Sequence, residues 1–201
     1  MEITNTHYIK NKIKYDRVTK VLSIIHDYGF ENMCRNLGYQ YVDAAFKLAA
    51  ERGTFFHKAM KLVADGVFNG LIEESMKENE MYDDIKIGQK WFEDNVKEII
   101  CAEKTFFSKL KFAGTVDLIA KLKDDKIYII DYKTGSIINR KHELQLAAYT
   151  SLAEKELKIK INKRMILQIN DNKLKQIIIK SDKSIDVNYF FYALTLYREF
   201  T

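Results

Sequence analysis

Two short β-prone runs, joined by a turn, place charged side chains inside apolar sequence. Residues 116–119 predict one strand and residues 126–133 the next, with Lys123-Asp-Asp125 as the turn. Side chains alternate along a strand, so Asp131 and Lys133 project from one face. Asp117, on the neighbouring strand, can reach the same place. Because most other residues of both runs are Val, Ile or Leu, the sequence predicts charges buried within a sheet.

Buried charges in a sheet have a chemical implication. A carboxylate placed there is unstable unless it is paired or binds a metal. Two carboxylates beside one ammonium suit a divalent cation, with the lysine directed at an anion or a water. This pattern is typical of phosphodiester cleavage. The alternative is an exposed hairpin in which Lys133 simply forms a salt bridge to Asp117 or Asp131.

The length and composition of the chain favour one globular unit. It has 201 residues, of which 47% are hydrophobic and 30% charged, enough for one sizeable core and short for two. We expect a single domain over residues 1–201, mainly helical over 1–100 and carrying the sheet and the metal site over 101–201. The net charge of +5 is consistent with a polyanionic partner.

Several protein classes are disfavoured. Cys34 and Cys101 are too few for a zinc pattern or for a four-cysteine iron–sulfur cluster. The chain has no run of about 18 apolar residues that would span a membrane. Residues 1–16 are polar and lack the apolar segment of a secretory signal. We therefore expect a cytoplasmic protein without a membrane partner.

The first half of the chain shows helical periodicity and no predicted strand. Apolar residues recur at helical spacing, and Gly53 interrupts one such stretch. Thr54 then reads as the N-cap of the next helix. The predicted helices cover residues 18–28, 30–37, 42–51, 55–64, 68–79 and 88–100.

The second half alternates strands and helices. Strands are expected over residues 102–110, 116–119 and 126–133, then a helix over 141–156, a hairpin of 164–170 and 173–180 around Asp171-Asn172, and a helix over 187–200. This order predicts an α/β fold, a central mixed β-sheet flanked by helices, with a helical N-terminal half.

Four short motifs in a fixed order resemble a known family. They are Arg52-Gly-Thr-Phe-Phe-His57, Gly114-Thr-Val-Asp117, Asp131-Tyr-Lys133-Thr-Gly135 and Gln145-Leu-Ala-Ala-Tyr149. Together they resemble the PD-(D/E)XK nucleases and, within them, the RecB-type branch that includes phage exonucleases and the mitochondrial genome maintenance exonuclease. Arg17-Val-Thr-Lys-Val-Leu22 is similar to the S-V-T-x-V-L start of those exonucleases, although Asp16-Arg17 replaces the expected Pro-Ser.

The resemblance implies a restriction-endonuclease-like core and a deoxyribonuclease that uses one or two Mg²⁺ or Mn²⁺ ions. It assigns Asp117, Asp131, His57 and the backbone carbonyl of Tyr132 as metal ligands. Glu103 would reach the metal through a water, with a solvated strand residue as the equal alternative.

The resemblance also implies catalytic roles. Lys133 would hold or deprotonate the attacking water, or steady the charge on the phosphate. Gln145 and Tyr149, four residues apart on one helix face, would orient the lysine and touch DNA. Without the preceding Asp131-Tyr-Lys133, these two would be read as part of an ordinary amphipathic helix.

The expected substrate is DNA with a free end, with single strands preferred, in a bacterial or phage-infected cell. An endonuclease or flap nuclease on the same fold is the alternative, and a catalytically silent DNA-binding protein is another. The residues leave cleavage polarity and oligomeric state open. Candidate phosphate contacts are Arg52, Thr54, Lys58, Lys109, Lys111, Thr134, Arg140 and Lys141.

Overall fold

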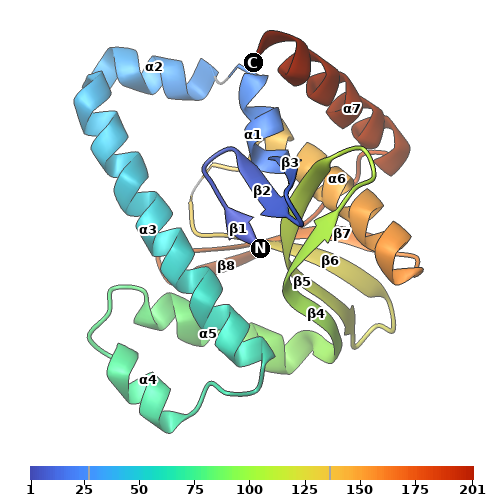
Figure 1. Cartoon of the computed structure of the whole chain (residues 1–201). Coiled ribbons are helices and arrows are strands. Elements are labelled where there is room, and N and C mark those ends of the chain that lie inside the picture. Colours follow the sequence, from blue (N-terminus) through green and yellow to red (C-terminus); the bar gives the residue numbers. More distant parts are fainter. Residues whose placement is uncertain (27, 136) are drawn as a thin grey trace.

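A mixed β-sheet forms the centre of the computed structural model, which describes residues 1–26, 28–135 and 137–201 (Figure 1). The strands follow the order β1-β2-β3-β5-β6-β7-β8, and β4 pairs with β5 outside this path. The strands are β1 (Glu2–Ile3), β2 (His7–Lys10), β3 (Ile13–Arg17), β4 (Val96–Phe107), β5 (Phe112–Leu122), β6 (Ile127–Lys133), β7 (Lys163–Asn170) and β8 (Lys173–Ile178).

Helices cover both faces of this sheet. On one face α1, α6 and α7 pack on one buried apolar cluster, and on the other α3 and α5 pack on a second. This arrangement confirms the predicted α/β class with a mixed sheet between helices. The helices are α1 (Val18–Val21), continued by a 3₁₀ turn (Leu22–Ile24), α2 (Tyr28–Leu37), α3 (Tyr39–Ala64), α4 (Gly70–Met76), α5 (Tyr82–Asn95), α6 (Arg140–Leu157) and α7 (Lys183–Phe200).

Strand β5 forks the sheet at its middle. β4 runs antiparallel along one edge of β5, while two different strands share the other edge. Residues 112–113 pair with β3 in parallel, and residues 118–121 pair with β6 in antiparallel fashion. Asp117 therefore lies in the gap between β3 and β6. Its carboxylate can accept a backbone hydrogen bond there, where β5 has no neighbouring strand on that edge among the described residues.

Helix α3 is longer than the sequence predicts. The expected break at Gly53 is wrong, because α3 runs without interruption from Tyr39 to Ala64. Thr54 is not an N-cap either, since its Oγ1 donates to the carbonyl of Ala50 at 2.8 Å from within the helix. A glycine inside a helix costs only about 1 kcal/mol relative to alanine, which burial of residues such as Phe56 and Met60 offsets.

Residues 96–100 form a strand and not the end of a helix. Helix α5 stops at Asn95, whose side-chain Nδ2 donates to the carbonyl of Trp91 at 2.8 Å. The Val and Ile residues that follow match helical spacing, but they also favour an extended backbone. They begin β4, which pairs with β5 along most of its length.

The N-terminal segment is the largest difference from the prediction of a helical first half. β2 and β3 form an antiparallel hairpin whose turn residues Asn11 and Lys12 have φ values of 52° and 65°. The predicted 18–28 helix is shortened to α1 and the 3₁₀ turn, and residue 27 lies outside the described residues. In the described part of the chain, no helix is long and apolar enough to cross a membrane.

A buried ion pair joins β7 to α7. Arg164 Nη1 donates to Asp186 Oδ2 at 2.7 Å, and Asp186 is fully buried. Ser181 Oγ donates to the same carboxylate oxygen at 2.6 Å, while Arg140, at the start of α6, bonds the other oxygen. The surrounding positive groups and hydrogen bonds lower the pKa of Asp186 in spite of its burial. This network fixes the N-terminal ends of α6 and α7 against the sheet.

We predict that Asp186→Ala lowers the free energy of unfolding by about 3–5 kcal/mol, because it leaves the buried Arg164 without a carboxylate. Asp182→Ala is the matched control. Asp182 only caps α7 from the surface, accepting hydrogen bonds from the amides of Ser184 and Ile185, and its loss should cost about 1 kcal/mol. Urea denaturation measures both. Equal losses would contradict the structural role of the buried pair.

Candidate active site

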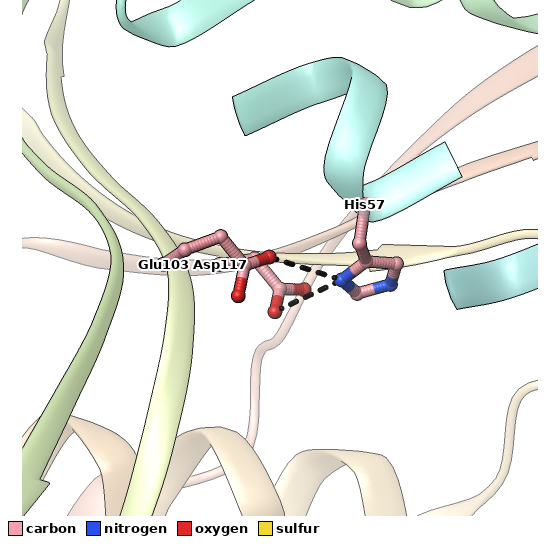
Figure 2. A group of neighbouring side chains, drawn as sticks. All are labelled: His57, Glu103 and Asp117. Atoms are coloured by element: carbon pink, nitrogen blue, oxygen red, sulfur yellow. Dashed lines mark hydrogen bonds and ion pairs between the residues drawn. The ribbon is translucent and has the colours of Figure 1, made fainter. Parts of the chain in front are cut away.

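Three side chains from separate elements converge beside the fork in the sheet. His57 extends from α3, Glu103 from β4 and Asp117 from β5 (Figure 2). His57 Nδ1 lies 3.4 Å from Glu103 Oε1 and 3.3 Å from Asp117 Oδ1. Its Nε2 donates to the backbone carbonyl of Tyr132 at 3.2 Å. Four of the sequence-predicted metal ligands thus meet at one place.

The backbone at Glu103 is unusual for a strand. The pairs Ala102 with Leu118 and Lys104 with Val116 place Glu103 opposite Asp117. Glu103 has a φ of 48°, in the left-handed region that is unfavourable for a residue with a Cβ. Strained backbone of this kind clusters at functional sites, where the surrounding structure maintains it. The strain coincides with the carboxylate that faces His57.

Charge compensation dominates the electrostatics of this cluster. Burial lowers the pKa of His57, but Asp117 and Glu103 outweigh it and raise the pKa to about 10. Burial raises the pKa of Asp117, yet His57, Lys133 and the backbone N–H of Tyr132 together lower it. That amide donates to Asp117 Oδ2 at 2.7 Å. Asp117 is therefore held as a carboxylate although it is almost fully buried.

The second acid belongs to a neighbouring chain of contacts. Asp131 Oδ2 lies 2.6 Å from Lys133 Nζ, and Gln145 Nε2 donates to Asp131 Oδ1 at 3.0 Å. The same amide donates to the Tyr149 hydroxyl at 3.2 Å. Burial and the nearby Asp117 raise the pKa of Asp131 against the effect of Lys133. The pKa of Lys133 is raised because Asp131 and Asp117 outweigh its burial.

Gly114 leaves room for the Tyr149 ring, which belongs to this second group of contacts. A Cβ built at Gly114 would lie 2.2 Å from Cε1 of Tyr149, much closer than atoms pack. The Tyr149 ring therefore lies directly against the β5 backbone, where its hydroxyl meets Gln145. This contact gives a physical reason for glycine three residues before Asp117.

A groove of about 1010 Å³ opens over His57, Glu103 and Lys133. Its walls come mainly from α3, with Thr19 of α1 also contributing, so the helical layer that contains α3 forms one side of the access route. Lys58 and Lys61 add positive charge to the walls. The arrangement leaves the cluster accessible to a solute from one side of the sheet.

A family comparison matches residues 32–190 to the PD-(D/E)XK nuclease superfamily. The chain belongs to this superfamily. The matched range contains all the residues of both contact groups and most of the sheet that carries them. The chain is thus a hydrolytic nuclease, as the motifs predicted.

Two solved structures are similar to this chain, and the first of them supports the fold. A protein from Eubacterium rectale, named as a candidate exonuclease, is 11% identical, with 92% of this chain and 78% of that chain covered and a TM-score of 0.50. The crystal structure of SSO0001 is 14% identical, with 94% and 78% covered and a TM-score of 0.43. No curated protein matches the nuclease.

Nucleases of this superfamily use divalent metal ions, and the residues present fit one. Ligand atoms of His57, Glu103 and Asp117 all lie within 4.8 Å of one another. Carboxylate and carbonyl oxygens with one imidazole suit a divalent cation that accepts oxygen and nitrogen ligands. Asp131 Oδ2 is buried and, apart from its ion pair with Lys133, accepts no hydrogen bond from the described residues.

The candidate metal-ligating cluster of His57, Glu103 and Asp117 differs in composition from the ligand set that the sequence predicts. The sequence placed Asp131 among the principal ligands and Glu103 as a water-mediated one. Among the described residues, the compact cluster contains Glu103 and does not contain Asp131. The reason is that Lys133 and Gln145 hold the Asp131 carboxylate on their own side.

The predicted phosphate contacts separate into two sets. Thr54 and Lys58 line the groove, and Thr134 Oγ1 lies 3.5 Å from a Cβ built at Gly53, next to it. Arg52 instead faces Met81 and Glu80. The remaining candidates lie in other surroundings: Lys109 and Lys111 in the β4–β5 turn, Arg140 bonded to Glu143 and Asp186, and Lys141 in the first turn of α6.

Sequence reasoning missed two polar residues of the groove, Thr19 and Lys61. Lys61 lies one helical turn after His57, so the predicted helix over residues 55–64 already placed both on one face and could have indicated Lys61. Thr19 lies in Arg17-Val-Thr-Lys-Val-Leu22, a segment to which neither the predicted helix nor the resemblance assigns a contact.

We predict that Glu103→Gly and Glu103→Ala differ in stability but not in metal binding. Both remove the carboxylate, so both should weaken Mn²⁺ binding about tenfold or more, measured by calorimetric titration. Glycine tolerates the left-handed backbone. The free energy of unfolding of Glu103→Gly should therefore be about 1 kcal/mol higher than that of Glu103→Ala. An alanine variant at least as stable as the glycine variant would contradict backbone strain at this position.

Proposed function

We propose that the chain is a deoxyribonuclease of the RecB-type branch, dependent on Mg²⁺ or Mn²⁺, that removes nucleotides from DNA ends. The observation that carries the proposal is the convergence of His57, Glu103 and Asp117 next to the Asp131–Lys133 pair. This combination fits phosphodiester hydrolysis better than structural ion pairing, because Asp117 and Asp131 are buried and an open groove lies over His57, Glu103 and Lys133. We also propose that the activity resides in a single domain and that the protein acts in the cytoplasm.

Hydrolysis joins a water oxygen to phosphorus and breaks the bond to the leaving sugar oxygen. A bound divalent ion would lower the pKa of water and neutralise phosphate charge. Lys133 is positioned to hold the attacking water or a phosphate oxygen, because Asp131 fixes its ammonium at 2.6 Å. Gln145 orients Asp131 in turn, and Tyr149 supports Gln145.

Loss of Lys133 or Asp131 should nearly abolish cleavage. We expect Lys133→Ala and Asp131→Asn to reduce turnover about 10³-fold or more, since the first removes the ammonium that acts at the reacting phosphate and the second removes the carboxylate charge that fixes it. Asp171→Asn is the control: it removes an acid in the β7–β8 turn, where asparagine also accepts the φ of 51°. Release of nucleotides from labelled DNA with Mg²⁺ measures all three. Wild-type turnover in either site variant would remove that residue from catalysis.

The helical layer favours an enzyme that takes a strand by its end. α2 has no buried residue, and in the first three turns of α3 only Val42 is buried, so this pair of helices extends away from the sheet (Figure 1). The groove at the metal-ligating cluster lies between α1 and α3. We infer that a single strand with a free end enters between these helices more readily than continuous duplex does. The name given to the Eubacterium rectale protein agrees with this proposal.

We therefore expect degradation of a linear single strand and little cleavage of the same sequence closed into a circle. The rates should differ by about 10²-fold or more, because the circle offers no end to enter the groove. Gel analysis of equal amounts of both substrates, with Mg²⁺, makes the comparison. Equal rates would favour an endonuclease or flap nuclease on this fold and leave the metal-ligating cluster as assigned.

A further inference from the structure

A second groove also reaches the metal-ligating cluster, at Glu103. It has a volume of about 570 Å³ and lies between the N-terminal segment and β4. Lys10 and Met1 form one wall, and Lys104 and Phe107 belong to the other. Glu103 lines this groove and also lines the larger groove next to α3. The two grooves therefore meet at a residue of the metal-ligating cluster.

The N-terminal hairpin is fixed on the face of the sheet that carries the cluster. Tyr8 Oη lies 3.0 Å from Thr115 Oγ1, which lies 2.8 Å from Thr105 Oγ1. The rings of Tyr8 and Tyr15 pack edge-on against Phe107. Thr105 and Phe107 share a strand face, since they are two residues apart on β4. The hairpin is thus held firmly enough to form a wall.

Lys10 provides the positive charge of this wall. Its ammonium lies 4.4 Å from the centre of the Phe107 ring, which positions it over β4. Among the described residues it forms no ion pair with a carboxylate. Lys104, in contrast, is paired with Glu156 at 3.1 Å. Lys10 is therefore the cation in this groove with charge to offer a phosphate.

We propose that this second groove binds the single-stranded nucleic acid on the far side of the scissile phosphate, with Lys10 contacting its backbone. The inference rests on the proposed nuclease function. A strand whose phosphate lies at the cluster continues in both directions, and each of the two grooves takes one direction. The hairpin lies outside residues 32–190, so this binding site goes beyond the family match.

The test measures binding without cleavage, using the full chain, a chelator and a fluorescent oligothymidine in an anisotropy titration. We expect Lys10→Glu to weaken binding about tenfold and to reduce the slope of log Kd against log salt by about 0.7, the value for one phosphate contact on a single strand. Lys12→Glu is the matched control. It makes the same charge change on the same hairpin, at an exposed turn residue outside the groove, and should change Kd less than twofold.

A length series extends the test. Oligonucleotides too short to reach from the cluster to Lys10 should bind the wild type and Lys10→Glu equally, and longer ones should separate the two. Equal effects of Lys10→Glu and Lys12→Glu at every length would overturn the proposed binding site. Failure of the wild type to release nucleotides with Mg²⁺ or Mn²⁺ would instead overturn the nuclease function, and the binding titration distinguishes the two outcomes because it needs no cleavage.

Discussion

Two carboxylates, Asp117 and Asp131, are buried in adjacent strands, and the surrounding structure compensates for their charge. Each acid has a different set of partners. The Tyr132 amide and His57 contact Asp117, while Lys133 and Gln145 contact Asp131. An uncompensated buried charge would strongly disfavour folding. The fork between β3 and β6, the course of α3 and the position of α6 together bring these partners to the two acids.

This compensation separates the site into two functional halves. The half around Asp117 offers oxygen and nitrogen ligands to a cation, and the half around Asp131 holds an ammonium in place. The halves come from opposite helical layers, since His57 lies on α3 and Gln145 on α6. Gly114 allows the second layer to approach closely, because the Tyr149 ring occupies the space of a side chain. The geometry of the site therefore depends on how both layers pack on β5.

Much of this organisation follows from local sequence patterns. The acid-bearing strands, α6 and α7 were predictable because apolar periodicity matches their burial. The hairpin around Asp171-Asn172 was predictable because both residues tolerate positive φ. Residues 96–100 were misread because Val and Ile at helical spacing also suit a strand, and the pairing of β4 with β5 decides between the two. The direct place of Glu103 in the cluster depends on a left-handed backbone that no local pattern specifies.

The residues of the metal-ligating cluster are far apart along the chain. Glu103 follows His57 by 46 residues, and both meet only when α3 lies across β4 and β5. A chain that is still being synthesised, or one that has lost its helical layer, has the acids but no assembled site. Completion of the fold is thus a condition for metal binding by this cluster. The capacity to cut nucleic acid depends on the packing of α3 against the sheet, which also forms a wall of the groove.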